Sequence, residues 1–330
     1  MESPTVRNDL LVMRELMFED LRYIVWKILL KYVPLNKESR EATVNRKRQE
    51  YANFVDMYYT NMNTKDLDDH ERKTFEVIKK DVYRTMPDYP FFQQKVIQDM
   101  LIRLLWVWNV RHPASGYVQG INDLTTPFIA AFLIEYLPNV NYDTFEKPSN
   151  FEEIFTEEVI GKLEADTYWC LSKILDGILD NYTFSQSGTQ KTLGKIKDIT
   201  KKIDADLFSH LEANEVDFTF FSFRWIFCLL VREFPLKVGL RLFDTYVSDE
   251  QGFSVLHMYV CAALLLKWSL KIKKMQFTDI MLFLQNMPTK DWGDKDIEMI
   301  IAEAYVFKTL YEDTHGHFTS NQLERSQSQN

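Results

Sequence analysis

Two short segments of this 330-residue chain place an arginine and a glutamine beside residues that can hold them. The first segment reads Ile78-x-x-Asp81-x-x-Arg84, and the second reads Tyr117-Val118-Gln119-Gly120. A guanidinium can stabilise charge that develops on a phosphate, and a carboxamide can orient an attacking water. The two segments therefore offer the groups that phosphoryl transfer by a GTPase needs from outside.

The local sequence indicates how each segment is positioned. A helix would stack Ile78, Asp81 and Arg84 on one face, and Pro87 disfavours helical backbone just before it. We therefore expect Arg84 near a helix end or in an extended turn. Gly116 and Gly120 permit close backbone approach on either side of the glutamine. Each segment alone is weak evidence, because Asp–Arg pairs are ordinary on helix surfaces and a glutamine at a helix start usually faces water.

Composition points to a helix-rich chain with a substantial core. Apolar residues make up 46% of the sequence, whereas glycine and proline contribute only 10 residues each. Residues that break regular structure are therefore scarce. The three cysteines, Cys170, Cys228 and Cys261, lie in apolar stretches, which predicts buried, reduced thiols. The longest apolar run, Met258 to Leu266, is too short to span a bilayer, so no integral membrane segment is expected.

Charge and motif content exclude several classes of function. The net charge is −9 and no long basic cluster occurs, which argues against nucleic-acid binding. The positive stretch from Lys271 to Lys274 is short. Gly188 to Lys195 resembles a phosphate-binding loop, but its glycine spacing is wrong and Ile196 replaces the required Ser or Thr. The scattered histidines argue against a metal site.

Hydrophobic periodicity predicts most of the helices. We expect them near residues 40–60, 91–110, 117–136, 164–182, 218–234, 253–270, 277–284 and 296–311. Polar composition predicts loops over residues 139–155 and 184–192. No stretch shows the alternation and hairpin turns of a β-sheet.

Taken together, the motifs resemble the TBC domain of Rab GTPase-activating proteins. Arg22-x-x-x-Trp26 matches the family's first motif, the segment ending in Arg84 matches the second, and Tyr117-x-Gln119-Gly120 matches the third. The likeness continues through Arg241-Leu242-x-Asp244-Thr245-Tyr246 to Pro288-Thr289-Lys290-Asp291-Trp292. The block from Asn109 to Pro127 is similar to the subgroup that contains the yeast Golgi Ypt/Rab GAP and its animal relatives.

The resemblance implies an all-α, V-shaped fold of two lobes. We expect an N-terminal segment over residues 1–9 and a TBC domain over 10–317, with lobes of about 10–205 and 206–317. Residues 318–330 are expected to form a disordered polar tail.

The resemblance also implies a mechanism with two catalytic fingers. Arg84 would be the arginine finger and Gln119 the glutamine finger, both acting in trans on a GTP-bound Rab-family GTPase. The chain would then be an activator of an enzyme, because the GTP and Mg²⁺ belong to its partner. Supporting roles fall to Asp81, Tyr117, Gly120 and Asn122 near the fingers, and to Arg22 and Trp26, which we interpret as structural.

A catalytically silent TBC-fold scaffold or effector that binds a Rab is the alternative, although such members often lack a finger. The expected location is the cytoplasm, with possible peripheral attachment to Golgi or endosomal membranes. One departure concerns the entry into the first motif. Family members usually carry Gly-Ile/Val-Pro there, whereas this chain has Leu16-Met17-Phe18-Glu19-Asp20.

Overall fold

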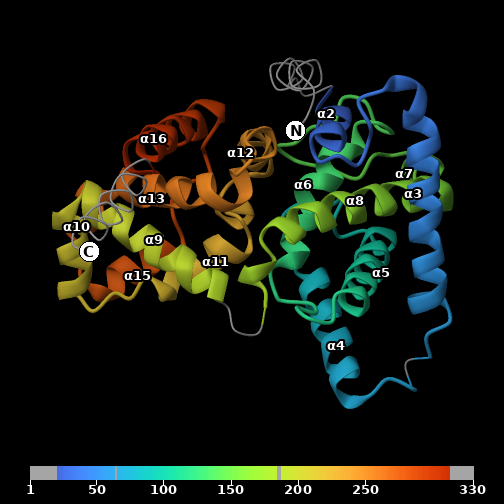
Figure 1. Ribbon diagram of the computed structural model, residues 1–330, viewed down its shortest axis with the longest axis horizontal. Helices are drawn as coiled ribbons and strands as arrows, with labels where there is room; N and C mark the ends of the chain where they lie inside the picture. The colour runs from blue at the N-terminus through green and yellow to red at the C-terminus, as the bar shows by residue number, and fades with distance from the viewer. Residues whose placement is uncertain (1–20, 64, 184–186, 313–330) are drawn as a thin grey trace, which may run out of the picture.

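A computed structural model of the protein describes residues 21–63, 65–183 and 187–312. Within these ranges every regular element is a helix and there is no strand. Figure 1 shows two groups of helices, with the N-terminal group on the right and the C-terminal group on the left. The predicted all-helical, two-lobed fold is confirmed. The N-terminal segment 1–9, the divergent residues 16–20 and the tail 318–330 lie outside the described residues.

The N-terminal lobe contains the following helices in chain order: α2 (Arg22–Leu29), η2 (Lys37–Ser39), α3 (Arg40–Val55), η3 (Asp56–Thr60), α4 (Asp69–Tyr83), α5 (Lys95–Arg111), α6 (Ile121–Leu133), α7 (Phe151–Ile154) and α8 (Glu157–Gly177). The short helix η4 (Leu179–Asn181) follows, and the chain then crosses to the other group.

The C-terminal lobe contains α9 (Ser187–Ile203), α10 (Ala205–Ala213), α11 (Thr219–Phe227), η5 (Val231–Glu233), α12 (Leu236–Ser248), η6 (Gly252–Leu256), α13 (His257–Lys267), α14 (Ser269–Ile272), α15 (Phe277–Gln285) and α16 (Asp294–Glu312). Helix α13 is apolar on all sides and packs between α9 and α16. Helix α12 contacts both α2 and α6, and it thereby joins the two lobes.

Helix α6 is the central helix of the N-terminal lobe, and each of its residues is buried. It packs against α2, α5 and α8, as its apolar sequence requires. Pro127 lies inside this helix and has no N–H to donate to the carbonyl of Asp123. The hydroxyl of Thr126 donates to that carbonyl at 2.8 Å instead. The helix can therefore carry a proline without leaving a buried carbonyl unpaired.

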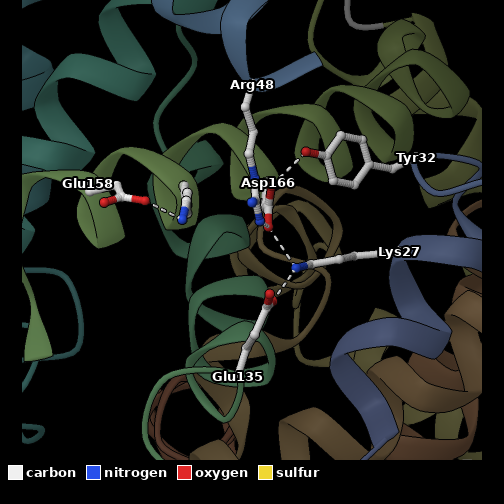
Figure 2. A network of polar contacts seen from close by, with 7 residues as sticks. Lys27, Tyr32, Arg48, Glu135, Glu158 and Asp166 are labelled. Atoms are coloured by element: carbon white, nitrogen blue, oxygen red, sulfur yellow. Dashed lines mark hydrogen bonds and ion pairs between the residues drawn. The ribbon is translucent and has the colours of Figure 1, made fainter. Parts of the chain in front are cut away.

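A buried ionic cluster ties α2, α3 and α8 together (Figure 2). The Asp166 carboxylate accepts from the Lys27 ammonium at 2.6 Å, from the Tyr32 hydroxyl at 2.6 Å and from both ends of the Arg48 guanidinium. Lys27 also donates to Glu135 at 2.6 Å. Burial alone would raise the pKa of Asp166, but the cations Lys27 and Arg48 outweigh it and lower that pKa. The carboxylate is therefore held ionised inside the lobe.

Most predicted helices are present, and the differences have local causes. The helices expected over 40–60, 91–110, 277–284 and 296–311 are found close to those limits. Helix α8 begins earlier than predicted because the Thr156 hydroxyl accepts from the Val159 N–H and caps it. The predicted loop over 184–192 is wrong from residue 187 onward, since α9 begins there.

Tertiary packing explains the beginning of α9. Its polar first turn is held because Thr189 is buried and its hydroxyl donates to the Asn181 carbonyl at 2.9 Å. Helix α9 then packs against α10, α11 and α13. It therefore lies with the C-terminal lobe, and the chain changes lobes earlier than the boundary expected near residue 205.

Candidate functional site

Arg84 stands at the C-terminal end of helix α4. The helix begins with a capping box in which Asp68 and Glu71 each accept a backbone N–H from the other. It ends at Tyr83, and Arg84 caps it with a non-helical backbone. The expectation that Arg84 lies at a helix end is confirmed, and its side chain is 56% exposed. A long cation is thus presented to solvent from a fixed helix end.

Hydrogen bonds from Gln93 stabilise the turn after Arg84. Met86 has a φ of 44°, a value that non-glycine residues rarely adopt. The Gln93 amide stabilises this turn by donating to the carbonyls of Thr85 and Met86 at 2.9 and 3.3 Å. The chain can therefore turn sharply after α4, and the Arg84 side chain remains exposed.

A buried aspartate connects Arg84 to the second segment. One oxygen of the Asp81 carboxylate accepts from Nη2 of Arg84 at 2.5 Å. The other accepts from the Tyr117 hydroxyl at 2.7 Å. Asp81 is only 2% exposed, so water competes little for either hydrogen bond. A single carboxylate thus fixes the arginine and the segment that carries Gln119.

Asn122 closes a second set of bonds between the same segments. Its amide nitrogen donates to the Thr85 hydroxyl at 2.9 Å, and that hydroxyl donates to the Asp81 carbonyl at 2.9 Å. Its amide oxygen lies 3.1 Å from both the Tyr117 hydroxyl and the Gly120 N–H. Asn122 therefore holds the backbone next to Gln119 against the end of α4.

Glycines shape the backbone around Gln119. Gly116 and Gly120 have φ values of 60° and 107°, in the region that favours glycine. A Cβ on Gly120 would also lie 3.1 Å from Sγ of Cys228 in the other lobe. Gln119 itself is exposed, and its amide makes no hydrogen bond with any residue that the structure describes. Its side chain is free to bind something outside the chain.

Burial and neighbouring charges shift the pKa values of three residues near the site. Burial and the nearby Asp81 carboxylate raise the pKa of Tyr117 well above its usual range, so the hydroxyl remains a donor. Burial also raises the pKa of Asp123, and the charge of Arg232 partly offsets that effect. Burial raises the pKa of the Cys228 thiol, so the thiol stays protonated and is a poor nucleophile.

The remaining sequence-derived candidates lie elsewhere. Arg22 and Trp26 are buried and bind Asp244 of α12, with Arg22 donating two hydrogen bonds of 2.8 and 2.9 Å and Trp26 one of 2.8 Å. Through Asp244 these residues join the two lobes. Among the described residues, no cluster of three or more His, Cys, Asp or Glu side chains could hold a metal ion. The segment that resembles a phosphate-binding loop lies within α9, and no strand precedes it among the described residues.

Three contributing residues were not singled out from the sequence as site residues. Thr85 follows the arginine directly, Gln93 holds the turn, and the Asn109 side chain accepts from the Tyr117 N–H at 2.9 Å. Asn109 lies within a motif block quoted above, and Thr85 directly follows the quoted segment that ends in Arg84. Nothing in the local sequence distinguishes Gln93, because its role depends on a turn visible only in three dimensions.

Comparison with known proteins identifies the family. The family model described as the Rab-GTPase-TBC domain matches residues 19–273. TBC1 domain family member 22B of Homo sapiens is 42% identical, over 91% of this chain and 57% of that protein. GTPase-activating protein gyp1 of Schizosaccharomyces pombe is 45% identical, over 96% of this chain and 61% of that protein. The chain thus spans about three-fifths of the length of these curated relatives.

Solved structures show the same fold. The crystal structure of the Ypt/Rab-GAP domain of Gyp1p superimposes with a TM-score of 0.82 at 40% identity, covering 92% of this chain and 93% of that one. The flagellar RabGAP TBC domain of Chlamydomonas gives a TM-score of 0.61 at 16% identity. The match covers 92% of this chain and 86% of that chain. The second likeness concerns the fold alone.

Proposed function

Because the chain belongs to the Rab-GTPase-TBC domain family, we propose that it is a GTPase-activating protein for a Rab-family small GTPase. Arg84 and Gln119 enter the active site of the GTP-bound partner and complete it in trans. The observation that carries the proposal is the network centred on Asp81 and Asn122. It ties the segments bearing both residues together and leaves both side chains exposed.

Arg84 supplies charge to the transition state. Its guanidinium stays protonated and can fork onto phosphate oxygens, which an ammonium cannot do. The hydrogen bond to Asp81 uses Nη2 and leaves other N–H groups for the partner. An arginine supplied in trans accelerates GTP hydrolysis by about 10³–10⁵-fold in other GTPase systems, or roughly 4–7 kcal/mol of barrier.

Gln119 orients the attacking water. Its amide oxygen can accept from the water while its NH₂ group donates to the phosphate, and an ionised carboxylate cannot do both. Gly120 and Asn122 hold the backbone beside it, so only the side-chain torsions of Gln119 remain to be ordered when the partner binds.

The partner brings the nucleotide, and this chain supplies side chains only. In this proposal the GTP and Mg²⁺ belong to the Rab, and the chain needs no cofactor of its own. We place the functional unit at residues 10–317. None of the described helices is long and apolar enough to cross a bilayer. We propose a cytoplasmic protein that attaches peripherally to Golgi or endosomal membranes and acts in vesicle trafficking.

Single-turnover GTP hydrolysis across a panel of Rab proteins tests the proposal. The wild-type chain should accelerate at least one Rab, and Arg84→Ala and Gln119→Ala should each remove most of that acceleration. Arg46→Ala is the matched control, since Arg46 is an exposed arginine on α3. If the wild type binds GTP-loaded Rabs yet accelerates none of them, the chain is a scaffold and the proposed activity is wrong.

A further inference from the structure

One exposed segment of the C-terminal lobe combines lysines with a protruding leucine. Lys267 ends α13, Leu270 and Lys271 lie in α14, and Lys274 lies in the turn that follows; all four are exposed. Backbone bonds from Lys271 and Ile272 to the Trp268 carbonyl, at 3.0 and 2.9 Å, continue the turn between the two helices. We call these four residues the basic face.

Aromatic rings hold the centre of the basic face in place. The Lys271 ammonium lies 4.6 Å from the ring centroid of Phe283 in α15 and 5.7 Å from that of Trp268. The two rings pack edge to face, with centroids 5.4 Å apart. Leu282, beside Phe283 on α15, is 58% exposed, and Leu270 is 79% exposed. Apolar groups therefore stand in solvent beside the lysines.

The charge of the basic face is not neutralised within the protein. Lys267, Lys271 and Lys274 pair with no carboxylate among the described residues. Lys273 is the exception in this segment, because its ammonium binds Asp204 at 3.0 Å. Residues 267–277 contain no acidic side chain, although the whole chain carries a net charge of −9. The one exposed carboxylate of α15 is Asp279, one turn before Leu282. The basic face is thus a local reversal of the overall charge.

A second exposed apolar strip, on α16, lies among acidic rather than basic side chains. On α16, Met299, Val306 and Leu310 are exposed, but Glu298 and Glu303 lie among them. An anionic surface would repel that strip. The combination of exposed leucine and unpaired lysines therefore singles out the basic face.

We propose that the basic face, together with Leu282, docks the protein onto a membrane containing anionic phospholipid. Lysine ammonium groups bind the anionic headgroups, and Leu270 enters the boundary between headgroups and acyl chains. A bilayer accepts a protruding leucine without a complementary pocket, which favours lipid over an acidic peptide. The surface lies in a different lobe from Arg84 and Gln119, so it does not depend on the proposed activity.

Vesicle co-sedimentation of the full chain tests the proposal. The protein should bind vesicles of phosphatidylcholine with about 30% phosphatidylserine and not vesicles of phosphatidylcholine alone. Each surface lysine contributes about five-fold to such binding. The Lys271→Gln/Lys274→Gln variant should therefore bind roughly 25-fold more weakly, and added salt should weaken wild-type binding. Leu270→Ser should weaken binding without changing charge.

The matched control is Lys37→Gln/Lys65→Gln, which removes the same charge from exposed sites in the other lobe. It should bind the vesicles as the wild type does. The proposal is overturned if the wild type ignores the anionic vesicles, or if the control loses as much binding as the test variant. Binding to polyglutamate without binding to vesicles would also overturn it, in favour of an acidic protein partner. Hydrolysis by a soluble Rab should be unaffected in all of these variants, which separates this test from that of the proposed activity.

Discussion

The hydroxyl of Tyr117 donates to the Asp81 carboxylate at 2.7 Å, and this bond joins the two segments that carry Arg84 and Gln119. The same carboxylate binds Arg84 through its other oxygen. Arg84 and the segment that carries Gln119 are therefore tied to one buried anion. The Tyr117 hydroxyl can be removed without removing either of the two proposed catalytic side chains.

Removing the Tyr117 hydroxyl tests this coupling. In Tyr117→Phe the buried Asp81 loses a donor, which should cost about 1–3 kcal/mol of unfolding free energy. The maximal rate of stimulated GTP hydrolysis should fall more than the affinity for the GTPase. Urea unfolding and single-turnover kinetics measure the two effects. Tyr58→Phe is the control, because that hydroxyl binds no described residue; equal losses in both variants would refute the coupling.

A glycine substitution tests the backbone beside Gln119. Gly120→Ala introduces a Cβ at a φ of 107° and 3.1 Å from Cys228 Sγ. We expect a stability loss of about 1–3 kcal/mol and a strong loss of GTPase stimulation. Gly161→Ala in α8 is the matched control, since its added Cβ would meet no atom within 4 Å beyond its chain neighbours and the backbone of its own helix. That control should be stabilised by about 0.5–1 kcal/mol with full activity. An active, unstrained Gly120→Ala protein would contradict the prediction.

A conservative change at Arg84 tests the need for a guanidinium. Arg84→Lys keeps the charge but loses the planar fork, so most of the rate should be lost, as in Arg84→Ala. Thermal unfolding should change little, because the side chain is mostly exposed. If lysine restored near wild-type rates, charge alone would suffice and the forked geometry would be unnecessary.

The contact between the lobes makes a prediction about stability. Asp244 accepts from both Arg22 and Trp26, and all three side chains are buried. Asp244→Ala removes the buried carboxylate that binds both Arg22 and Trp26 and should destabilise the protein by about 3–5 kcal/mol in urea unfolding. Asp99→Ala breaks the exposed pair with Lys95 and should cost less than about 1 kcal/mol. Similar midpoints for the two variants would argue against a structural role of the first motif.

Acid stability should depend on a buried histidine. Burial lowers the pKa of His257 to about 4, and its ring contacts the Tyr246 hydroxyl at 2.8 Å. The unfolded chain, with a histidine pKa of about 6.5, binds this proton more readily. Stability should therefore fall as pH drops from about 6.5 to 4, by on the order of 3 kcal/mol from this group.

Urea unfolding across that pH range measures the effect. In His257→Gln the stability loss between pH 6.5 and 4 should be smaller than in the wild type. His70→Gln, at an exposed position on α4, should keep the wild-type slope. Parallel curves for the wild type and His257→Gln would show that this histidine does not set the acid sensitivity.

The sequence alone determined the composition of the site and most of the helices. Apolar periodicity defines α5 and α15, because one face of each helix must enter the core. Pro87 implied that the helix would end near Arg84, since proline restricts the residue before it. Motif order identified Arg84 and Gln119 as the pair to examine, although spacing by itself could not place them together.

Only the tertiary structure decided how these parts meet. Asp81 contacts Tyr117 because α4 and the segment before α6 pack side by side, and no local pattern encodes that contact. Helix α9 forms from a polar, glycine-containing sequence because Thr189 is buried against Asn181. The basic face likewise depends on α15, whose Phe283 lies beneath Lys271. Local sequence sets helix limits and side-chain chemistry, whereas contacts between distant segments depend on how the whole core packs.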